Sequence, residues 1–257
     1  MDSSSTTTAP TLRLRGITKS FGHVIALSDV DVSAYAGEIL AIVGDNGAGK
    51  STLIKVISAV YRPDEGQVEV GGASLAMSTP ADAQRNGIAT VFQDLALVDV
   101  LDVATNMFLG QLPRRGWFVD RSAIETESRA FLDKLGVTVA SVKSEVGMLS
   151  GGQRQIIAIA RAMRTGARVI LLDEPTAALG VRETGQAAEL IRSLRDEGRA
   201  VICVSHDINF VFGLADRIQV MRLGRVAGVR RTADTTREEI IGLITGSIVP
   251  DSSEDES

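Results

Sequence analysis

The chain of 257 residues contains few of the residues that mark secreted, membrane-spanning or nucleic-acid-binding proteins. Its single cysteine, Cys203, excludes an internal disulfide, and the apolar run AVICVS around it predicts a buried thiol rather than a reactive one. Lys and Arg number 27 against 32 Asp and Glu, so the net charge of −5 gives no basic excess for binding nucleic acid. No apolar run approaches the roughly 18 residues that a membrane-spanning helix requires.

The remaining composition is that of a globular protein, with 44% apolar residues and enough length for a sizeable core. The N-terminal segment MDSSSTTTAPT has neither the basic nor the apolar region of a signal peptide, so we expect a cytoplasmic protein. Residues 1–10 and the acidic residues 249–257 are expected to be disordered tails. One domain is expected over residues 11–248.

Strand and helix patterns alternate along this domain, which predicts an α/β fold with a mostly parallel sheet. The expected strands are 11–16, 28–35, 38–43, 67–70, 88–92, 168–173 and 200–205. The expected helices are 50–60, 182–197, which Gly198 closes, and a short one near 235–246 that begins with a capping box of Thr235 and Glu238. Between about 94 and 165 helical patterns dominate, at 102–110, 121–135 and 151–164, so we expect a helical insertion there.

A glycine-rich loop between a strand and a helix predicts a phosphate-binding site. Residues 44–51, GDNGAGKS, match G-x-x-x-x-G-K-[ST], in which consecutive backbone N–H groups surround an anion at a helix N-terminus. We expect Lys50 to reach the β- and γ-phosphates and the hydroxyl of Ser51 to bind Mg²⁺. The predicted nucleotide-binding residues here are Gly44, Asp45, Asn46, Gly47, Ala48, Gly49, Lys50, Ser51 and Thr52.

Two carboxylates follow a buried strand in the segment LLDEP. Asp173 ends the apolar run and is expected to be a Mg²⁺ ligand, directly or through water. Glu174 comes next, at the edge of a parallel sheet where ligands bind, and is expected to polarise an attacking water. Without the phosphate loop these residues would read equally well as an acidic turn before Pro175.

A second predicted anion site lies in LSGGQ, residues 149–153. Ser150 fits a helix N-cap, and Gly151 and Gly152 leave backbone N–H groups accessible before Gln153. A single nucleotide hardly needs two such sites in one chain.

With GDNGAGKS, LSGGQ and LLDEP in this order, the chain resembles the ATP-binding subunits of ATP-binding cassette (ABC) transporters over roughly residues 11–246. The resemblance implies a P-loop NTPase core, an N-terminal antiparallel β subdomain and an inserted helical subdomain. It also implies two copies paired head to tail, with each ATP between the phosphate loop of one and the LSGGQ of the other. ATP and Mg²⁺ are then the expected cofactors.

Further residues are assigned from the same resemblance. Gln93 matches the glutamine that contacts Mg²⁺ and the attacking water, although an isolated glutamine is otherwise a surface amide. His206, at the end of a buried strand, matches the histidine that contacts the γ-phosphate. Phe21 matches the aromatic residue that stacks on adenine, and a core phenylalanine is the alternative. The catalytic residues are thus expected to be Glu174, His206, Gln93 and Lys50, and the metal ligands Ser51, Gln93 and Asp173.

One position departs from the usual family pattern, because Gly180 follows Leu179 where an aspartate is common. That aspartate helps to couple the two ATP sites, so the departure leaves open a non-hydrolysing, ATP-gated interaction module. However, PTAALGVRE, together with the segment that begins GDNGAGKSTLIKVISAVYRPDEG, resembles the ATP-binding subunits of monosaccharide importers of the ribose, xylose and fructose type, in which glycine is a normal form.

The expected function is therefore ATP hydrolysis that powers monosaccharide import at the cytoplasmic face of the membrane. The expected partners are a second copy, permease subunits and, indirectly, a sugar-binding receptor protein, with no nucleic acid. The permease is expected to dock at 94–118, whose apolar residues Leu95, Leu97, Val98 and Leu101 could equally be core. The ATPase of a different ABC importer, or of an exporter, stays an alternative, whereas a small-molecule kinase would leave LSGGQ without a role.

Overall fold

The computed structural model describes residues 9–177 and 179–248. The tails expected at 1–10 and 249–257 therefore lie outside the described residues, except for Ala9 and Pro10. Among the described residues, none of the helices has the length and apolarity needed to cross a bilayer.

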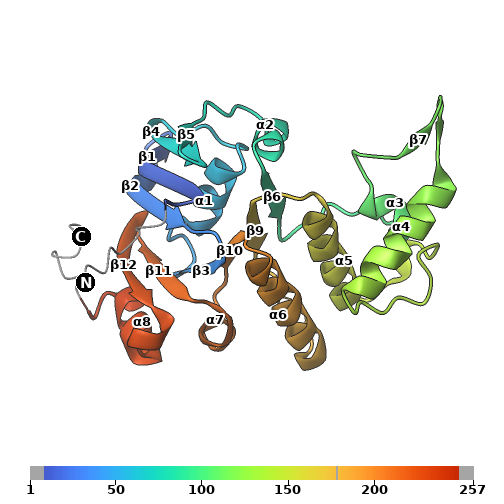
Figure 1. Ribbon diagram of the computed structural model, residues 1–257. Helices are drawn as coiled ribbons and strands as arrows, with labels where there is room; N and C mark the ends of the chain where they lie inside the picture. The colour runs from blue at the N-terminus through green and yellow to red at the C-terminus, as the bar shows by residue number, and fades with distance from the viewer. Residues whose placement is uncertain (1–8, 178, 249–257) are drawn as a thin grey trace, which may run out of the picture.

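A central sheet of six strands runs through the molecule in the order β12-β11-β3-β10-β9-β6 (Figure 1). Its members are β3 (Glu38–Val43), β6 (Ile88–Val91), β9 (Val169–Asp173), β10 (Ala200–Val204), β11 (Arg217–Arg222) and β12 (Arg225–Arg231). All neighbours are parallel except the β11–β12 pair. The expected mostly parallel sheet is confirmed, and its continuous apolar strands follow from burial on both faces.

A second, antiparallel sheet in the order β2-β1-β4-β5 lies on one face of the central sheet. It consists of β1 (Leu12–Phe21), β2 (Val24–Ala34), β4 (Glu65–Val70) and β5 (Ala73–Ser74). This is the N-terminal β subdomain that the resemblance implied. The strands β1 and β2 are longer than the expected 11–16 and 28–35. The sequence pattern missed part of them because register shifts after Leu14 and Ile17 break the alternation of apolar and polar residues.

Each central strand contributes to two hydrophobic cores, one on either face. In β3, Leu40 and Ile42 pack with the antiparallel sheet and α1 (Lys50–Ile57). The alternating Ile39 and Ala41 pack on the opposite face, with α6 (Val181–Asp196) and α7 (Ile208–Leu214). Another helix near the sheet, α2 (Pro80–Arg85), precedes β6.

The expected helical insertion consists of α3 (Val103–Met107), α4 (Arg121–Lys134) and α5 (Gly151–Arg164), with a short hairpin of β7 (Arg114–Arg115) and β8 (Phe118–Val119). In Figure 1, α3 and α4 lie beyond α5, on the side away from β12. The first helix is shorter than the expected 102–110, because Asp102 is its N-cap and it ends at Met107. Its buried residues belong to the same core as α6 and α7, so the insertion extends the domain.

The last helix, α8 (Arg237–Thr245), begins one residue later than the expected capping box. Thr236, not Thr235, accepts the hydrogen bond from the backbone N–H of Glu239, at 3.2 Å. Thr235 instead donates to the Glu239 carboxylate, and Arg230 pairs with the same carboxylate at 2.7 Å. The prediction of Thr235 and Glu238 was wrong because adjacent threonines and glutamates allow two registers, and the ion pair from β12 stabilises the other one.

Candidate nucleotide site

The predicted catalytic residues come together because four parallel strands end at the same edge of the central sheet. The neighbouring strands β3, β10, β9 and β6 are followed by the phosphate loop, His206, Glu174 and Gln93, respectively. Segments that are far apart in the sequence therefore form one candidate site.

The phosphate loop has a backbone that only glycine fits at two positions. Gly44 and Gly49 have φ angles of 152° and 102°, in the region that side chains disfavour. A Cβ atom on Gly44 would lie 2.2 Å from the carbonyl oxygen of Met221, and one on Gly49 would lie 2.7 Å from that of Ala26. No side chain caps α1, so the N–H groups of its first turn remain available to an anion.

Lys50 lies folded over this loop and is only 8% exposed. Its ammonium donates hydrogen bonds to the carbonyl oxygens of Gly44 at 2.6 Å and Asp45 at 2.9 Å. Burial lowers the pKa of Lys50, while the nearby carboxylates, chiefly Glu174, act in the opposite direction. The cation is thus already positioned beside the loop, and Ser51 follows it on the exposed side of the helix start.

Among the described residues, Glu174 and His206 are the only two side chains of the site that hydrogen-bond to each other. The Nδ1 atom of His206 lies 2.9 Å from Oε2 of Glu174. The side chain of Glu174 is 15% exposed and that of His206 is 69% exposed, so the pair connects the interior to solvent. Glu174 has a φ of 50°, an unfavourable angle for a side-chain-bearing residue, and its N–H donates to Val204. Such strain is concentrated at functional sites.

Asp173 lies beside this pair, at the end of β9. Burial raises the pKa of Asp173, and the neighbouring charge of Glu174 raises it further. No hydrogen bond to its carboxylate occurs within the described part of the chain. A partly buried carboxylate that accepts no hydrogen bond from the described residues is suited to binding a cation.

Gln93 and Phe21 both lie on the surface. Gln93 is exposed just after β6. Phe21 ends β1 and is 43% exposed, with its ring edge-to-face against Tyr61 at a centroid distance of 5.1 Å. The alternative of a core phenylalanine therefore does not hold, and the roles of both residues in nucleotide binding stay predictions.

The second predicted anion site begins helix α5. Ser150 and Gln153 form a reciprocal capping box, with hydrogen bonds of 3.2 and 3.0 Å between backbone N–H groups and side-chain oxygens. Within the described residues, none of Ser150, Gly151, Gly152 and Gln153 hydrogen-bonds to the phosphate loop, Asp173 or Glu174. The expected sharing of each nucleotide between two copies stays a prediction.

Glu183 lies beside both Gly180 and Gly152, a contact that the sequence did not predict. Gly180 is the N-cap of α6 with an ordinary φ of −74°, so glycine is not required by the backbone. A Cβ atom there would lie 2.8 Å from a carboxylate oxygen of Glu183, and one on Gly152 would lie 2.6 Å from the Cγ atom of the same residue. Glu183 therefore fills the space between the start of α6 and the start of α5. Ala178 lies outside the described residues.

This packing gives a prediction for two neighbouring glycines. Gly152→Ala should destabilise the protein by about 1–3 kcal/mol, because the new methyl group overlaps Glu183. Gly151→Ala is the matched control, since its Cβ would meet nothing within 4 Å, and it should be neutral or stabilising by up to about 1 kcal/mol. Adding Glu183→Ala should restore most of the loss in Gly152→Ala, measured by urea unfolding. Equal effects at both glycines would contradict the packing.

Two further residues fix the segment after Gln93 to the helical insertion, Arg161 in α5 and Asn106 in α3. Arg161 donates to the carbonyl oxygens of Leu95 at 2.7 Å and Ala96 at 2.8 Å. The fully buried Asn106 holds Val98 through two hydrogen bonds. Each of these two residues is a polar side chain within an apolar helical pattern, and that pattern is the sequence signal that could have identified it. Leu95 and Leu97 pack partly against the core, whereas Val98 is exposed, so the surface at 94–118 is only partly apolar.

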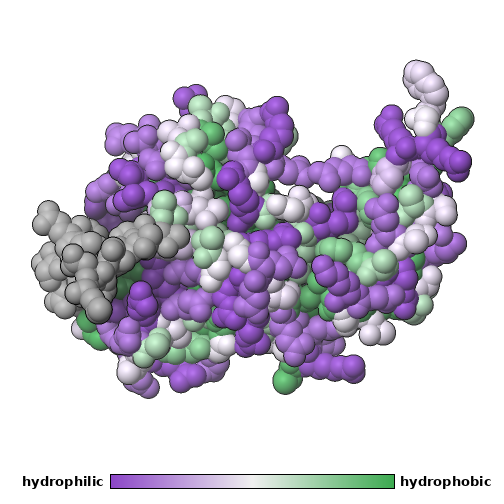
Figure 2. All heavy atoms as spheres, in the orientation of Figure 1, coloured by the Kyte–Doolittle hydropathy of each residue, from purple (hydrophilic) through white to green (hydrophobic). Residues whose placement is uncertain are grey.

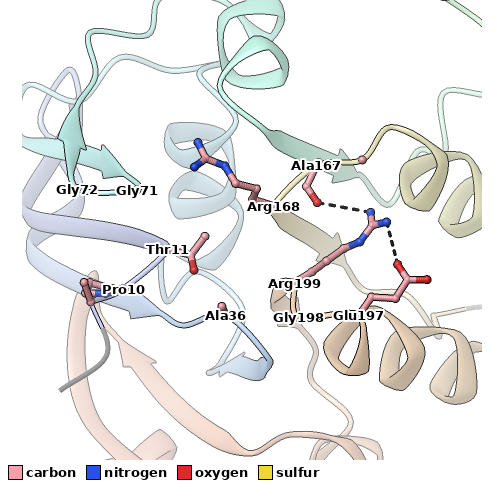
Figure 3. A pocket seen from close by; sticks show the side chains of 12 residues that line it. Pro10, Thr11, Ala36, Gly71, Gly72, Ala167, Arg168, Glu197, Gly198 and Arg199 are labelled. Carbon is pink, nitrogen blue, oxygen red and sulfur yellow. Dashed lines mark hydrogen bonds and ion pairs between the residues drawn. The ribbon is translucent and has the colours of Figure 1, made fainter. Parts of the chain in front are cut away.

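A pocket of about 490 Å³ lies elsewhere, at the opposite edge of the sheet (Figure 3). It lies where β9 and β10 begin, and its lining includes Arg168 and Arg199. Arg199 donates to the carbonyl oxygens of Met163 and Ala167 and pairs with Glu197 at 2.9 Å. These contacts satisfy carbonyl groups at and just after the C-terminal end of α5, and the pocket contains none of the predicted nucleotide-binding residues.

Comparison with known proteins matches residues 27–177 to the family described as ABC transporter. This chain belongs to the ABC transporter family. Its match covers the phosphate loop, LSGGQ and LLDEP, so the family that the sequence motifs indicated is confirmed.

Several relatives in this family are sugar-import proteins. The chain is 44% identical to the fructose import ATP-binding protein FrcA of Rhizobium meliloti, over 94% of this chain and 96% of that protein. It is 41% identical to the xylose/arabinose import ATP-binding protein XylG of Sulfolobus acidocaldarius, over 91% and 93%. Against the ribose import ATP-binding protein RbsA 1 of Rubrobacter xylanophilus it is 43% identical over 92% of this chain but spans 47% of the relative.

Solved ABC cassettes share the fold. The ADP conformation of MJ1267, an ATP-binding cassette of an ABC transporter, matches with a TM-score of 0.78 and 27% identity over 93% of this chain and 96% of that one. A dimeric post-hydrolysis state of the cassette MJ0796 bound to ADP and Pi matches with a TM-score of 0.74 and 26% identity over 86% and 98%. The predicted α/β P-loop NTPase fold is thereby confirmed, and the chain is an ATP-binding cassette.

Proposed function

We propose that the chain is the ATP-hydrolysing subunit of an importer for a monosaccharide. The convergence of the phosphate loop, Asp173 and the Glu174–His206 pair at one edge of the sheet carries the proposal for hydrolysis. The printed names of the relatives, which import fructose, ribose and xylose or arabinose, support the sugar class. The non-hydrolysing module is less well supported, because Asp173 and Glu174 are both present at the edge of the sheet although Gly180 replaces the usual aspartate.

The donor groups suit a magnesium nucleotide. Lys50 and the N–H groups of α1 would bind phosphate, and oxygen atoms of Ser51, Asp173 and Gln93 would hold Mg²⁺ with help from water. When bound, Mg²⁺ would neutralise charge on the phosphates. Glu174 would orient and deprotonate the attacking water, while His206 holds the carboxylate in place and Phe21 stacks on the base.

Two copies are proposed to close on two nucleotides, with LSGGQ of each facing the phosphate loop of the other. Closure would move α5, and Arg161 would transmit this movement to the segment at 94–118, where permease subunits would dock. The subunit would then lie at the cytoplasmic face of the membrane as a peripheral protein, and a receptor protein would select the sugar. The division into a core at 11–248 with an insertion at 94–165 stays part of this proposal.

Sugar uptake by the source cell tests the proposal. Deletion of the gene for this chain should abolish the uptake of labelled fructose, ribose, xylose or arabinose, and the intact gene should restore it. Uptake of maltose, a disaccharide, is the control and should be unchanged. Unaltered uptake of all four monosaccharides would contradict the sugar assignment without touching ATP hydrolysis, which the purified chain tests separately.

A further inference from the structure

The hairpin of β7 and β8 carries adjacent exposed apolar side chains that nucleotide binding does not explain. Trp117 is 95% exposed and Phe118 is 80% exposed, and Val119 beside them is exposed as well. In Figure 1 this hairpin projects from the far side of α4, away from both sheets. In Figure 2 the projecting tip carries hydrophilic and hydrophobic atoms side by side. We propose that the hairpin tip, Arg114–Val119, at the end of the segment where permease subunits would dock, inserts into the interface of an anionic lipid bilayer beside the permease.

The hairpin places one cation and one apolar group on each of its faces. Arg115 is paired with Phe118 and Arg114 with Val119, so each pair lies on one side of the ribbon. Gly116, with a φ of 66°, forms the tight turn and puts Trp117 at the end. The tip therefore has Trp117 at its end and one arginine on each face of the ribbon.

The base of the hairpin is fixed to the domain. Leu112 packs against the main core, and the N–H of Asp120 donates to the carbonyl oxygen of Pro113 at 2.9 Å. The carboxylate of Asp120 caps α4 through the N–H of Ala123 at 3.0 Å. The exposed side chains of Trp117 and Phe118 therefore lie on a hairpin whose base is fixed to the domain.

The chemistry of the tip fits a lipid interface better than a protein surface. Indole and phenyl rings favour the headgroup region, and arginines beside them are attracted to anionic lipids. Among the described residues no carboxylate pairs with Arg114 or Arg115, so both charges are available. A protein partner would require shape complementarity, whereas strands of two residues each offer little contact area and the bilayer demands no fixed shape.

Trp117 is the only tryptophan of the chain, so its fluorescence reports on this tip alone. The purified full chain is mixed with vesicles of phosphatidylcholine, with or without phosphatidylglycerol. Anionic vesicles should shift the emission to shorter wavelength, and brominated lipids should quench it. Neutral vesicles should have much weaker effects.

Charge variants that keep Trp117 separate the proposal from non-specific adsorption. Arg114→Gln with Arg115→Gln should weaken binding to anionic vesicles by about thirty-fold, since each arginine near the surface contributes roughly five-fold. The matched control, Arg225→Gln with Arg231→Gln, makes the same charge change on exposed residues of β12 and should bind normally. No shift with anionic vesicles, or an equal loss in the control, would overturn the proposal, as would a shift seen only with detergent-solubilised permease. ATP hydrolysis plays no part in this experiment, so its result is independent of the proposed function.

Discussion

Glu174→Gln is expected to reduce the rate of ATP hydrolysis by about 10²–10⁴-fold, the usual contribution of a positioned general base. The amide keeps the size of the carboxylate and can still hydrogen-bond to His206, so the geometry of the strand end should persist. Nucleotide should still bind, because Lys50 and the glycine loop are unchanged. The variant should therefore accumulate as an ATP-bound dimer, visible by size-exclusion chromatography in the presence of ATP and Mg²⁺.

The control for this experiment is Glu189→Gln, which makes the same chemical change on the exposed face of α6. Phosphate release by this control should equal that of the unmodified chain. If Glu174→Gln hydrolysed ATP at the normal rate, the assignment of Glu174 would be wrong. If the unmodified chain showed no turnover even at high concentration, hydrolysis by the isolated subunit would be contradicted, which leaves an ATP-gated module or an ATPase that requires its permease, and adding permease subunits would distinguish the two.

Asp173→Asn is expected to reduce magnesium-dependent ATP hydrolysis by at least about 10²-fold. The same change is expected to stabilise the nucleotide-free protein against unfolding. Burial and the charge of Glu174 raise the pKa of Asp173, which means that the ionised form is disfavoured in the folded state. The neutral amide of asparagine removes the free-energy cost of keeping an ionised carboxylate at this position in the folded state. Urea unfolding without nucleotide at neutral pH should therefore show a higher midpoint for the variant.

The pH dependence of the stability difference between Asp173→Asn and the unmodified chain tests whether the charge of Asp173 causes that difference. Because the folded state binds the proton of Asp173 more tightly than the unfolded state, protonation stabilises the native protein as the pH falls through the raised pKa. The advantage of Asp173→Asn should be greatest at neutral pH and should disappear as the pH approaches the ordinary value of 3.8. Asp234→Asn, an exposed control, should show no such advantage. A variant that is less stable at neutral pH would contradict the electrostatic explanation.

The sequence by itself determined the fold class, the phosphate loop and the family, because these depend on local patterns. Glycines at 44, 47 and 49 before Lys50 specify a loop whose backbone few other residues can adopt. Continuous apolar runs specify strands that are buried on both faces. The helix start at Ser150 was also predictable, because its capping box lies within four residues.

Only the tertiary structure decided how distant segments meet. The order of β3, β10, β9 and β6 brings His206 within hydrogen-bonding distance of Glu174, and no local pattern specifies the order of strands. The role of Glu183 between two glycines and the start of α8 at Thr236 likewise depend on side chains from other elements. Local sequence fixes backbone conformation through φ, capping and hydrophobic periodicity, whereas packing contacts between residues far apart in the chain arise only when the whole core is buried.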